Sequence, residues 1–279
     1  MLIYKIFNRI VFLVFKIVLS PLRGKKQFQP LYYNIHNLSL LGMNYGYADM
    51  LINGEYRILN ILKNNININE EIVIFDVGAN IGNYSKMIID QLANISYQLY
   101  SFEPSKETYL VLEQNLRGSS AKLYNIGFGK EINEQILFSD SHLSGLASLS
   151  NRRLEHFNIN FKNTEIIKLT TLDEFCKDKN ITKIDFLKLD VEGHELNVLK
   201  GAKLLLENRA IKIIQFEMGG ANIDSRTFFQ DFWYLLSGKY KIYRIIKNGL
   251  IEVKGYEESL EIFKNINFLA IQVNSIYTE

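Results

Sequence analysis

The sequence predicts an α/β fold, built on a seven-stranded, mostly parallel sheet with helices on both faces and an antiparallel last strand. Two observations predict it. From residue 72 onward, short apolar runs alternate with longer segments of helical periodicity, which is the pattern of successive βαβ units. Of 279 residues, 47% are hydrophobic and 22% charged, so the chain has the composition of a folded protein with a sizeable core.

The elements of this sheet follow one another without an internal repeat. The apolar runs predict strands at 71–78, 97–104, 121–127, 184–190, 210–217, 240–246 and 267–273, and helical periodicity predicts helices at 82–92, 105–116, 195–207 and 227–236. Asn248-Gly249 predicts a turn. Residues 129–170 interrupt the alternation with polar, turn-rich sequence, so we expect an acceptor-loop insert there.

Residues 1–27 predict a basic, apolar helix outside the sheet. Lys5, Arg9 and Lys16 fall on one narrow helical face, and apolar side chains fill the rest. Lys16 disfavours a membrane-spanning helix, and Pro21 ends the helix. The pattern is typical of a helix in a membrane interface, while packing on the main domain or on a second subunit is the alternative.

Charge and cysteine content exclude several classes of protein. Residues 1–48 carry six basic and no acidic residues, so the remaining 26 basic and 30 acidic residues give the body a net charge of −4. An acidic body disfavours a nucleic-acid partner. The single Cys176 excludes an internal disulfide framework, and no CxxC or HExxH motif offers a zinc site.

These features predict three parts of the chain and its location. Residues 1–27 form the basic helix, residues 28–63 an aromatic-rich cap, and residues 64–279 the main domain. We expect a cytoplasmic protein that lies on the inner face of the cytoplasmic membrane through residues 2–20.

A glycine-rich turn directly follows the first strand, which covers residues 72–77. It reads Asp76-Val77-Gly78-Ala79-Asn80-Ile81-Gly82, and its glycines allow a tight turn and a close approach of a ligand. The spacing is GxxxG rather than the GxGxxG of a dinucleotide-binding turn, and the preceding acid favours a cationic ligand over a pyrophosphate. Glu103 ends the next strand, where a carboxylate accepts both hydroxyls of a ribose. A purely structural turn is the alternative.

These segments resemble the FkbM-type S-adenosylmethionine-dependent methyltransferases, which have the Rossmann-like class I methyltransferase fold. The matching stretches are FDVGANIGNYS (75–85), SFEPSKETYLVLEQNL (101–116), TTLDEF (170–175), IDFLKLDVEGHELNVLKGA (184–202) and IIQFE (213–217). The likeness runs from about residue 53 to residue 273. One departure is Phe128, which stands where a small polar or acidic residue is expected beside the adenine.

The resemblance implies that S-adenosylmethionine is the cofactor. The residues that it implies to bind the cofactor are Asp76, Gly78, Ala79, Asn80, Gly82 and Glu103. It also implies methyl transfer to a hydroxyl, and we expect the acceptor to be a sugar of a polysaccharide, glycolipid or related glycan. The alternatives are an N- or protein methyltransferase on the same fold and a non-catalytic, membrane-associated module that binds the cofactor.

Candidate catalytic residues follow the fourth and fifth predicted strands. A hydroxyl acceptor benefits from a base, and Asp190 and His194 are the best placed by motif, with Glu217 next. Glu192 could cap the following helix instead, and His194 could be a packed histidine. Lys188 could pair with an acid. Carboxylates can hold Mg²⁺ through oxygen ligands, but we expect no metal here.

Overall fold

The computed structural model describes residues 2–47, 49–65 and 70–273 of a chain that divides into two compact units, 1–45 and 46–279. The first unit contains α1 (Leu2–Leu19), η1 (Ser20–Leu22), η2 (Lys26–Phe28) and α2 (Gln29–Gly42). Helix α1 ends just before Pro21, as predicted. Among the described helices, none combines the length and the apolar character needed to cross a membrane.

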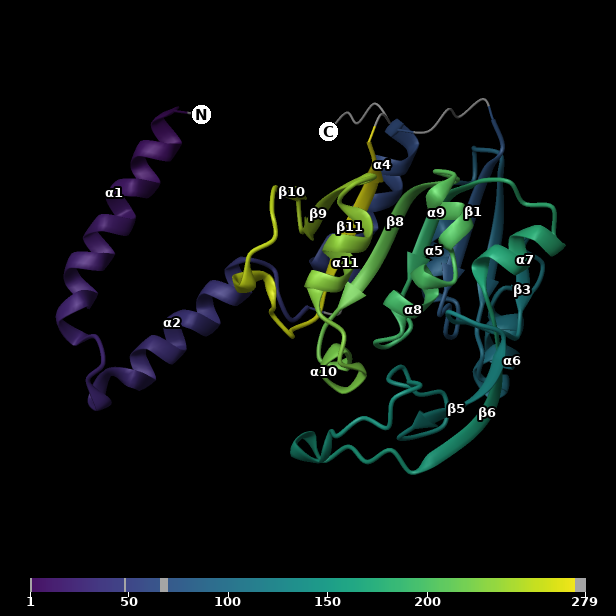
Figure 1. Cartoon of the computed structure of the whole chain (residues 1–279), viewed down its shortest axis with the longest axis horizontal. Helices are drawn as coiled ribbons and strands as arrows, with labels where there is room; N and C mark the ends of the chain where they lie inside the picture. Colours follow the sequence, from purple (N-terminus) through teal and green to yellow (C-terminus); the bar gives the residue numbers. More distant parts are fainter. Residues whose placement is uncertain (1, 48, 66–69, 274–279) are drawn as a thin grey trace. The chain divides into compact units, whose positions relative to one another are not determined.

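The second unit is organised around an eight-stranded sheet with the order β10-β9-β11-β8-β7-β1-β2-β3 (Figure 1). Its strands are β1 (Ile72–Val77), β2 (Tyr97–Phe102), β3 (Lys122–Tyr124), β7 (Ile184–Leu189), β8 (Ile211–Met218), β9 (Tyr240–Ile246), β10 (Gly249–Val253) and β11 (Ile266–Gln272). The five neighbouring strands β8, β7, β1, β2 and β3 run parallel to one another, and β11 runs antiparallel to both β8 and β9. The predicted α/β class is therefore confirmed.

The sheet has one strand more than predicted. The eighth strand is β10, which forms a hairpin with β9. Gly249 pairs with Ile246, so the turn consists of Lys247 and Asn248 rather than Asn248 and Gly249.

Helices α4 (Ile58–Asn65) and α5 (Asn83–Gln91) cover one face of the sheet. Their residues Leu62 and Ile88 share a buried core with Ile74 of β1. The neighbouring Phe75 points to the opposite face, because successive strand residues alternate.

That opposite face carries α7 (Leu172–Asp178) and α11 (Phe229–Leu236). The rings of Phe75 and Phe175 meet edge to face at 5.8 Å, and those of Phe216 and Phe232 stack at 4.6 Å. The central strands β1, β7 and β8 are thus buried on both sides, as their continuous apolar runs predicted.

The remaining helices connect these elements. They are α3 (Met50–Asn53), η3 (Glu55–Arg57), α6 (Lys106–Asn115), η4 (Glu155–Phe157), α8 (Glu195–Lys200), α9 (Lys203–Glu207), α10 (Ala221–Ser225) and η5 (Glu258–Leu260). The prediction of one helix over 195–207 was wrong, because α8 ends at Gly201. A Cβ atom on Gly201 would overlap the carbonyl oxygen of Gly129, so only a glycine allows the two segments to approach this closely.

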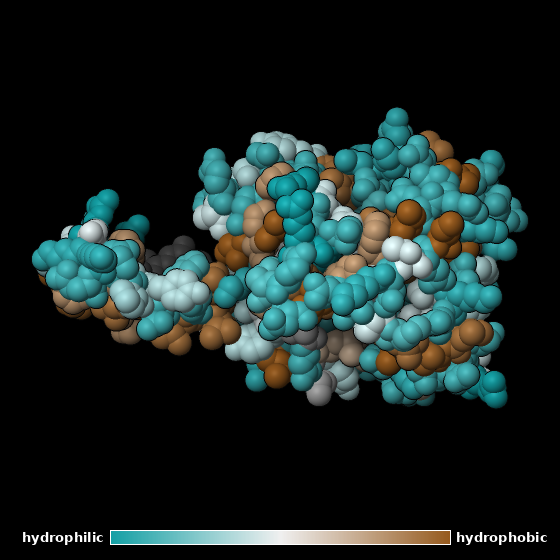
Figure 2. Space-filling model, turned by 90° about the horizontal axis from the view of Figure 1, so that it is seen from below, coloured by the Kyte–Doolittle hydropathy of each residue, from teal (hydrophilic) through white to brown (hydrophobic). Residues whose placement is uncertain are grey.

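The insert at 129–170 contributes to a second sheet, with the order β4-β6-β5. Its strands are β4 (Gly127–Phe128), β5 (Asn133–Ser139) and β6 (Asn163–Thr170). Leu137 and Ile167 are buried, whereas Ile136 and Ile166 are exposed, so one face of this small sheet packs inward. Seen from the side of the small sheet, the surface is largely hydrophilic with separate hydrophobic patches (Figure 2).

Candidate active site

The turn after β1 is held tightly between the neighbouring strands. Gly78 and Gly82 have left-handed backbone conformations, with φ of 80° and 91°. A Cβ atom on Gly78 would collide with the carbonyl oxygen of Asp190, at the end of β7. The backbone N–H groups of Gly78 and Ala79 donate to the carbonyl oxygen of Phe102, at 3.0 and 2.9 Å. Packing between strand ends therefore requires glycine at position 78, even before any ligand is considered.

Glu103 follows β2 directly and holds this turn through a hydrogen bond. Its carboxylate accepts backbone N–H groups from Asn80 at 3.1 Å and from Ser105 at 2.9 Å, and the residue is buried. Burial raises the pKa of Glu103 to about 7, although the two hydrogen bonds oppose this change. The carboxyl group is thus fixed in position and changes charge near neutral pH.

A cavity opens beside these groups, at the carboxyl ends of β1, β2 and β7, and the small sheet covers it. Its walls bring together five predicted site residues: Gly78, Asn80, Glu103, Asp190 and His194. Apolar residues, among them Phe102, Ile126, Phe128, Leu137 and Leu169, form much of the remaining wall. Asp76, Ala79, Gly82 and Glu217 are not among the lining residues.

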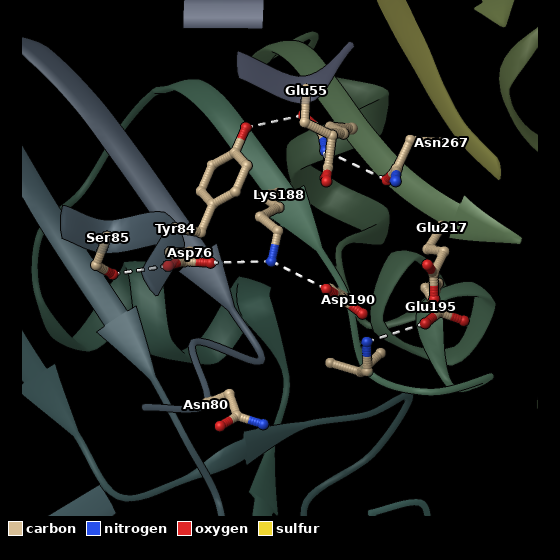
Figure 3. Close-up of polar contacts among 12 residues, drawn as sticks. Glu55, Asp76, Asn80, Tyr84, Ser85, Lys188, Asp190, Glu195, Glu217 and Asn267 are labelled. Carbon is tan, nitrogen blue, oxygen red and sulfur yellow. Dashed lines mark hydrogen bonds and ion pairs between the residues drawn. The ribbon is translucent and has the colours of Figure 1, made fainter. Parts of the chain in front are cut away.

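Asp76 lies beneath the cavity, in a row of polar residues that crosses the sheet. The strand register aligns Asp76 of β1 with Lys188 of β7 and Gln215 of β8. Asp76 is fully buried, and its carboxylate accepts a hydrogen bond from Ser85 at 2.7 Å and lies 3.5 Å from the ammonium of Lys188 (Figure 3).

Lys188 connects this row to the cavity. Its Nζ also lies 3.2 Å from Oδ2 of Asp190 and 4.6 Å from the centre of the Tyr84 ring. Burial by itself would lower the pKa of Lys188, but the charges of Asp190, Asp76 and Glu55 raise it above its ordinary value. The lysine therefore stays charged and holds one oxygen of Asp190 at the rim of the cavity.

Gln215 connects the row to the segment that precedes β1. Its amide nitrogen donates to Glu55 at 2.6 Å and to Asn267 of β11 at 3.2 Å, while its oxygen accepts from the Tyr84 hydroxyl at 2.9 Å. Burial raises the pKa of Glu55, and the charge of Lys188 opposes this. The buried amide, phenol and carboxyl groups beneath the site thus form hydrogen bonds with one another.

Three carboxylates gather beyond the row, at the ends of β7 and β8. One oxygen each of Asp190, Glu192 and Glu217 lies within 4.8 Å of the others. Burial and the charge of Asp190 raise the pKa of Glu192 to about 8, and burial, Asp190 and Glu192 raise the pKa of Glu217. The sequence placed these acids at adjacent strand ends, and the structure brings them into one cluster.

Arg152 is a residue of this site that sequence reasoning missed. It comes from the insert, its side chain is 7% exposed, and its Nη1 donates to Oε2 of Glu192 at 2.6 Å. It also lies 3.8 Å from Asp224. Neither spacing nor periodicity distinguishes it from the adjacent Arg153, so the sequence offered no signal for it.

His194 and Glu195 begin helix α8. Burial and the charge of Lys130 lower the pKa of His194 to about 4, so its ring is neutral at pH 7. Its Nδ1 lies 3.2 Å from the amide nitrogen of Asn197, and its buried Nε2 has no hydrogen-bond partner among the described residues. Where Asn197 donates to Nδ1, the ring proton lies on Nε2, which is buried near Gly129.

Glu195, rather than Glu192, holds the loop that precedes α8, and no described side chain caps the first turn of this helix. Its Oε1 accepts the backbone N–H groups of Val191 at 2.9 Å and Gly193 at 3.2 Å. Burial raises the pKa of Glu195 to about 7, against the effect of these hydrogen bonds. The Glu192 carboxylate is thereby left to pair with Arg152.

The chain is similar to known methyltransferases. A family described as methyltransferase FkbM domain matches residues 76–245. The hexuronic acid methyltransferase AglP of Haloferax volcanii is 27% identical over 151 residues, which are 54% of this chain and 58% of that protein. The chain thus matches less than two thirds of that relative's length.

Among solved structures, the methyltransferase FkbM of Methylobacillus flagellatus KT has 18% identity and a TM-score of 0.43, with 72% of this chain and 44% of that chain covered. The plantazolicin methyltransferase BpumL, in complex with SAH, has 12% identity and a TM-score of 0.43, with 89% and 91% covered.

Proposed function

The chain belongs to the FkbM methyltransferase family, and we propose that it transfers a methyl group from S-adenosylmethionine to a hydroxyl of a sugar in a polysaccharide, glycolipid or related glycan. The observation that carries this proposal is the single cavity that Glu103 and the turn at Gly78 line from one side and Asp190 and His194 from the other. Donor and acceptor groups can meet only where both sets of residues face one space.

The cavity fits the proposed cofactor. Glu103 is held by two backbone N–H groups and keeps further acceptor capacity for the two ribose hydroxyls. Phe102, Ile126 and Phe128 offer an apolar wall for the flat adenine ring, so the departure at Phe128 suits stacking rather than a polar contact. Gly78 and Asn80 would lie along the methionine and ribose portions, while Asp76, Ala79 and Gly82 shape the turn from behind.

Methyl transfer requires an acceptor oxygen in line with the bond that breaks. S-adenosylmethionine supplies a methyl group on a positively charged sulfur. We assign Asp190 to accept the proton of the acceptor hydroxyl as its oxygen bonds to the methyl carbon and the carbon–sulfur bond breaks. We assign His194, which lines the same cavity, to orient the acceptor. Glu217 is the next candidate for the base.

We propose a sugar acid as the acceptor within this class. The Haloferax volcanii relative, 27% identical over 151 residues, is described as a hexuronic acid methyltransferase. Arg152 lies beside the cavity, where a guanidinium suits recognition of a carboxylate.

Transfer of radiolabelled methyl from S-adenosylmethionine into glycan fractions of the source cell tests this function. We expect the label in a sugar-containing fraction, with turnover lower by about 10²- to 10⁴-fold in Asp190→Asn at nearly unchanged affinity for the demethylated cofactor. Label in protein alone, or full turnover in Asp190→Asn, would refute the acceptor class or the base, respectively.

We also propose that α1 binds an anionic membrane surface. Its exposed apolar side chains are Ile6, Phe7, Ile10, Phe12, Leu13, Val14, Phe15, Ile17 and Val18. Arg9 and Lys16 are exposed as well and supply positive charge for lipid headgroups. The full chain should therefore sediment with anionic vesicles at low salt, and a chain without residues 1–26 should not, with cofactor affinity unchanged. A full chain that ignores the vesicles would indicate that α1 packs on protein.

A further inference from the structure

The three clustered carboxylates have the arrangement of a cation site. Asp190, Glu192 and Glu217 come from the ends of β7 and β8, and one oxygen of each lies within 4.8 Å of the others. Two oxygens on opposite sides of one ion are separated by about 4.1 Å for Mg²⁺ and about 4.6 to 5.2 Å for Ca²⁺. The spacing therefore fits a single divalent ion.

Each of these carboxylates keeps an oxygen for a ligand. Lys188 engages Oδ2 of Asp190, Arg152 engages Oε2 of Glu192, and Asn265 donates to Oε1 of Glu217 at 3.4 Å. Across the described parts of the chain, no hydrogen bond engages the second oxygen of any of the three. The protein contacts thus orient the carboxylates without using all their acceptor capacity.

Glu195 provides an independent observation. It is 1% exposed, and while its Oε1 accepts the backbone N–H groups of Val191 and Gly193, its buried Oε2 has no hydrogen-bond partner in the described residues. Figure 3 shows its carboxylate next to that of Glu217, and its charge acts on both Glu192 and Glu217. A buried carboxylate oxygen without a donor costs free energy, and a cation or a water bound to it would remove this cost.

The cluster contains more acidic than basic side chains, which also favours a bound cation. In the described parts of the chain, the acids Asp76, Asp190, Glu192, Glu195 and Glu217 are accompanied by two cationic side chains, Lys188 and Arg152. Lys188 lies between Asp76 and Asp190, and Arg152 contacts Glu192 and Asp224, so neither Glu195 nor Glu217 has a cationic partner among the described residues. A divalent ion would supply this missing charge.

We propose that Asp190, Glu192 and Glu217 bind one divalent cation, with Glu195 next to it, at the acceptor side of the cavity. This inference reverses the expectation drawn from the sequence. Its role in transfer rests on the proposed function: the ion would bind an acceptor oxygen, make that hydroxyl more acidic and allow a negatively charged sugar to approach four carboxylates.

Binding of Mn²⁺ alone to the full chain tests the site. Loss of the free Mn²⁺ signal in electron paramagnetic resonance should show one tight site per chain. Glu217→Gln should weaken this site at least tenfold, because it removes one anionic ligand and keeps the shape of the side chain. The matched control is Glu174→Gln, which changes a partly exposed acid outside the site, and this variant should bind Mn²⁺ as the native chain does.

The outcomes separate this inference from the proposed function. No Mn²⁺ bound at millimolar concentration, or equal binding by Glu217→Gln and the native chain, would overturn the cation site even where methyl transfer is observed. Affinity for the demethylated cofactor reports the folding of each variant, so that loss of Mn²⁺ binding in a folded Glu217→Gln supports the site. Mn²⁺ binding without methyl transfer to any glycan would overturn the proposed function and leave the site standing.

Discussion

Replacing Lys188 with methionine should destabilise the sheet at its centre. Methionine keeps the unbranched stem next to the Tyr84 ring and removes only the charge. Asp76 is fully buried and would lose its cationic partner at 3.5 Å, whereas the side chain of Asp190 is 38% exposed and can be hydrated instead. Breaking a buried ion pair costs about 3 to 5 kcal/mol, and because water screens Asp190, we expect a loss of about 3 kcal/mol.

Urea unfolding monitored by circular dichroism measures this loss. A change of 3 kcal/mol corresponds to a decrease of about 6 to 12 °C in the melting temperature for a domain of this size. The matched control is Lys203→Met, which removes an exposed lysine whose partner Glu207 lies 4.0 Å away, and it should change the free energy of unfolding by less than about 1 kcal/mol.

A double variant separates the ion pair from packing. Asp76→Asn in the Lys188→Met background removes the unpaired buried charge, so it should restore part of the lost stability. If Lys188→Met is as stable as Lys203→Met at pH 8, the buried ion pair does not stabilise the fold and the reasoning is refuted.

Three further predictions concern the cavity and the core. Burial raises the pKa of Glu103 to about 7, so about a tenth of this carboxyl group is ionised at pH 6. The ionised form is the one that accepts both ribose hydroxyls. Calorimetry should therefore show about tenfold weaker binding of the demethylated cofactor at pH 6 than at pH 8, and no such change in Glu103→Gln. Gly78→Ala places a Cβ atom on the carbonyl oxygen of Asp190, so it should lower the melting temperature and weaken cofactor binding together. Phe175→Ala removes a ring that packs on Phe75 and should cost about 3 to 5 kcal/mol in urea unfolding.

Each of these three predictions has an outcome that would contradict it. Equal cofactor affinity at pH 6 and pH 8 would mean that the charge of Glu103 does not contribute to binding. A Gly78→Ala variant with native melting temperature and affinity would show that the turn can move away from Asp190. A loss below 1 kcal/mol in Phe175→Ala would mean that the neighbouring rings close the cavity left behind.

The central strands of the main sheet were predictable because they are buried on both faces. Strands such as Ile184–Leu189 therefore read as continuous apolar runs. The small sheet was missed, since β5 and β6 alternate exposed and buried residues and their sequences, NEQILFS and NTEIIKLT, look like polar loops. The FkbM resemblance itself is confirmed by the family match over residues 76–245.

The candidate site was predictable only where its residues stand at strand ends. Gly78, Glu103 and Asp190 share a cavity because parallel strands bring their carboxyl ends to one edge of the sheet. Arg152 could not be found this way, because it lies 40 residues from Glu192 in a segment without periodicity. Its contact exists only once the insert has folded over the sheet.

The place of β11 in the sheet has a consequence for how the chain is made. β11 is the last described strand to leave the ribosome, yet it lies between β8 and β9, both of which are synthesised earlier. Until it arrives, both β8 and β9 lack their native neighbour and expose unpaired backbone groups. The nascent chain is therefore most exposed to aggregation just before β11 inserts, and chaperones that shield strand edges should associate with it at that stage of translation.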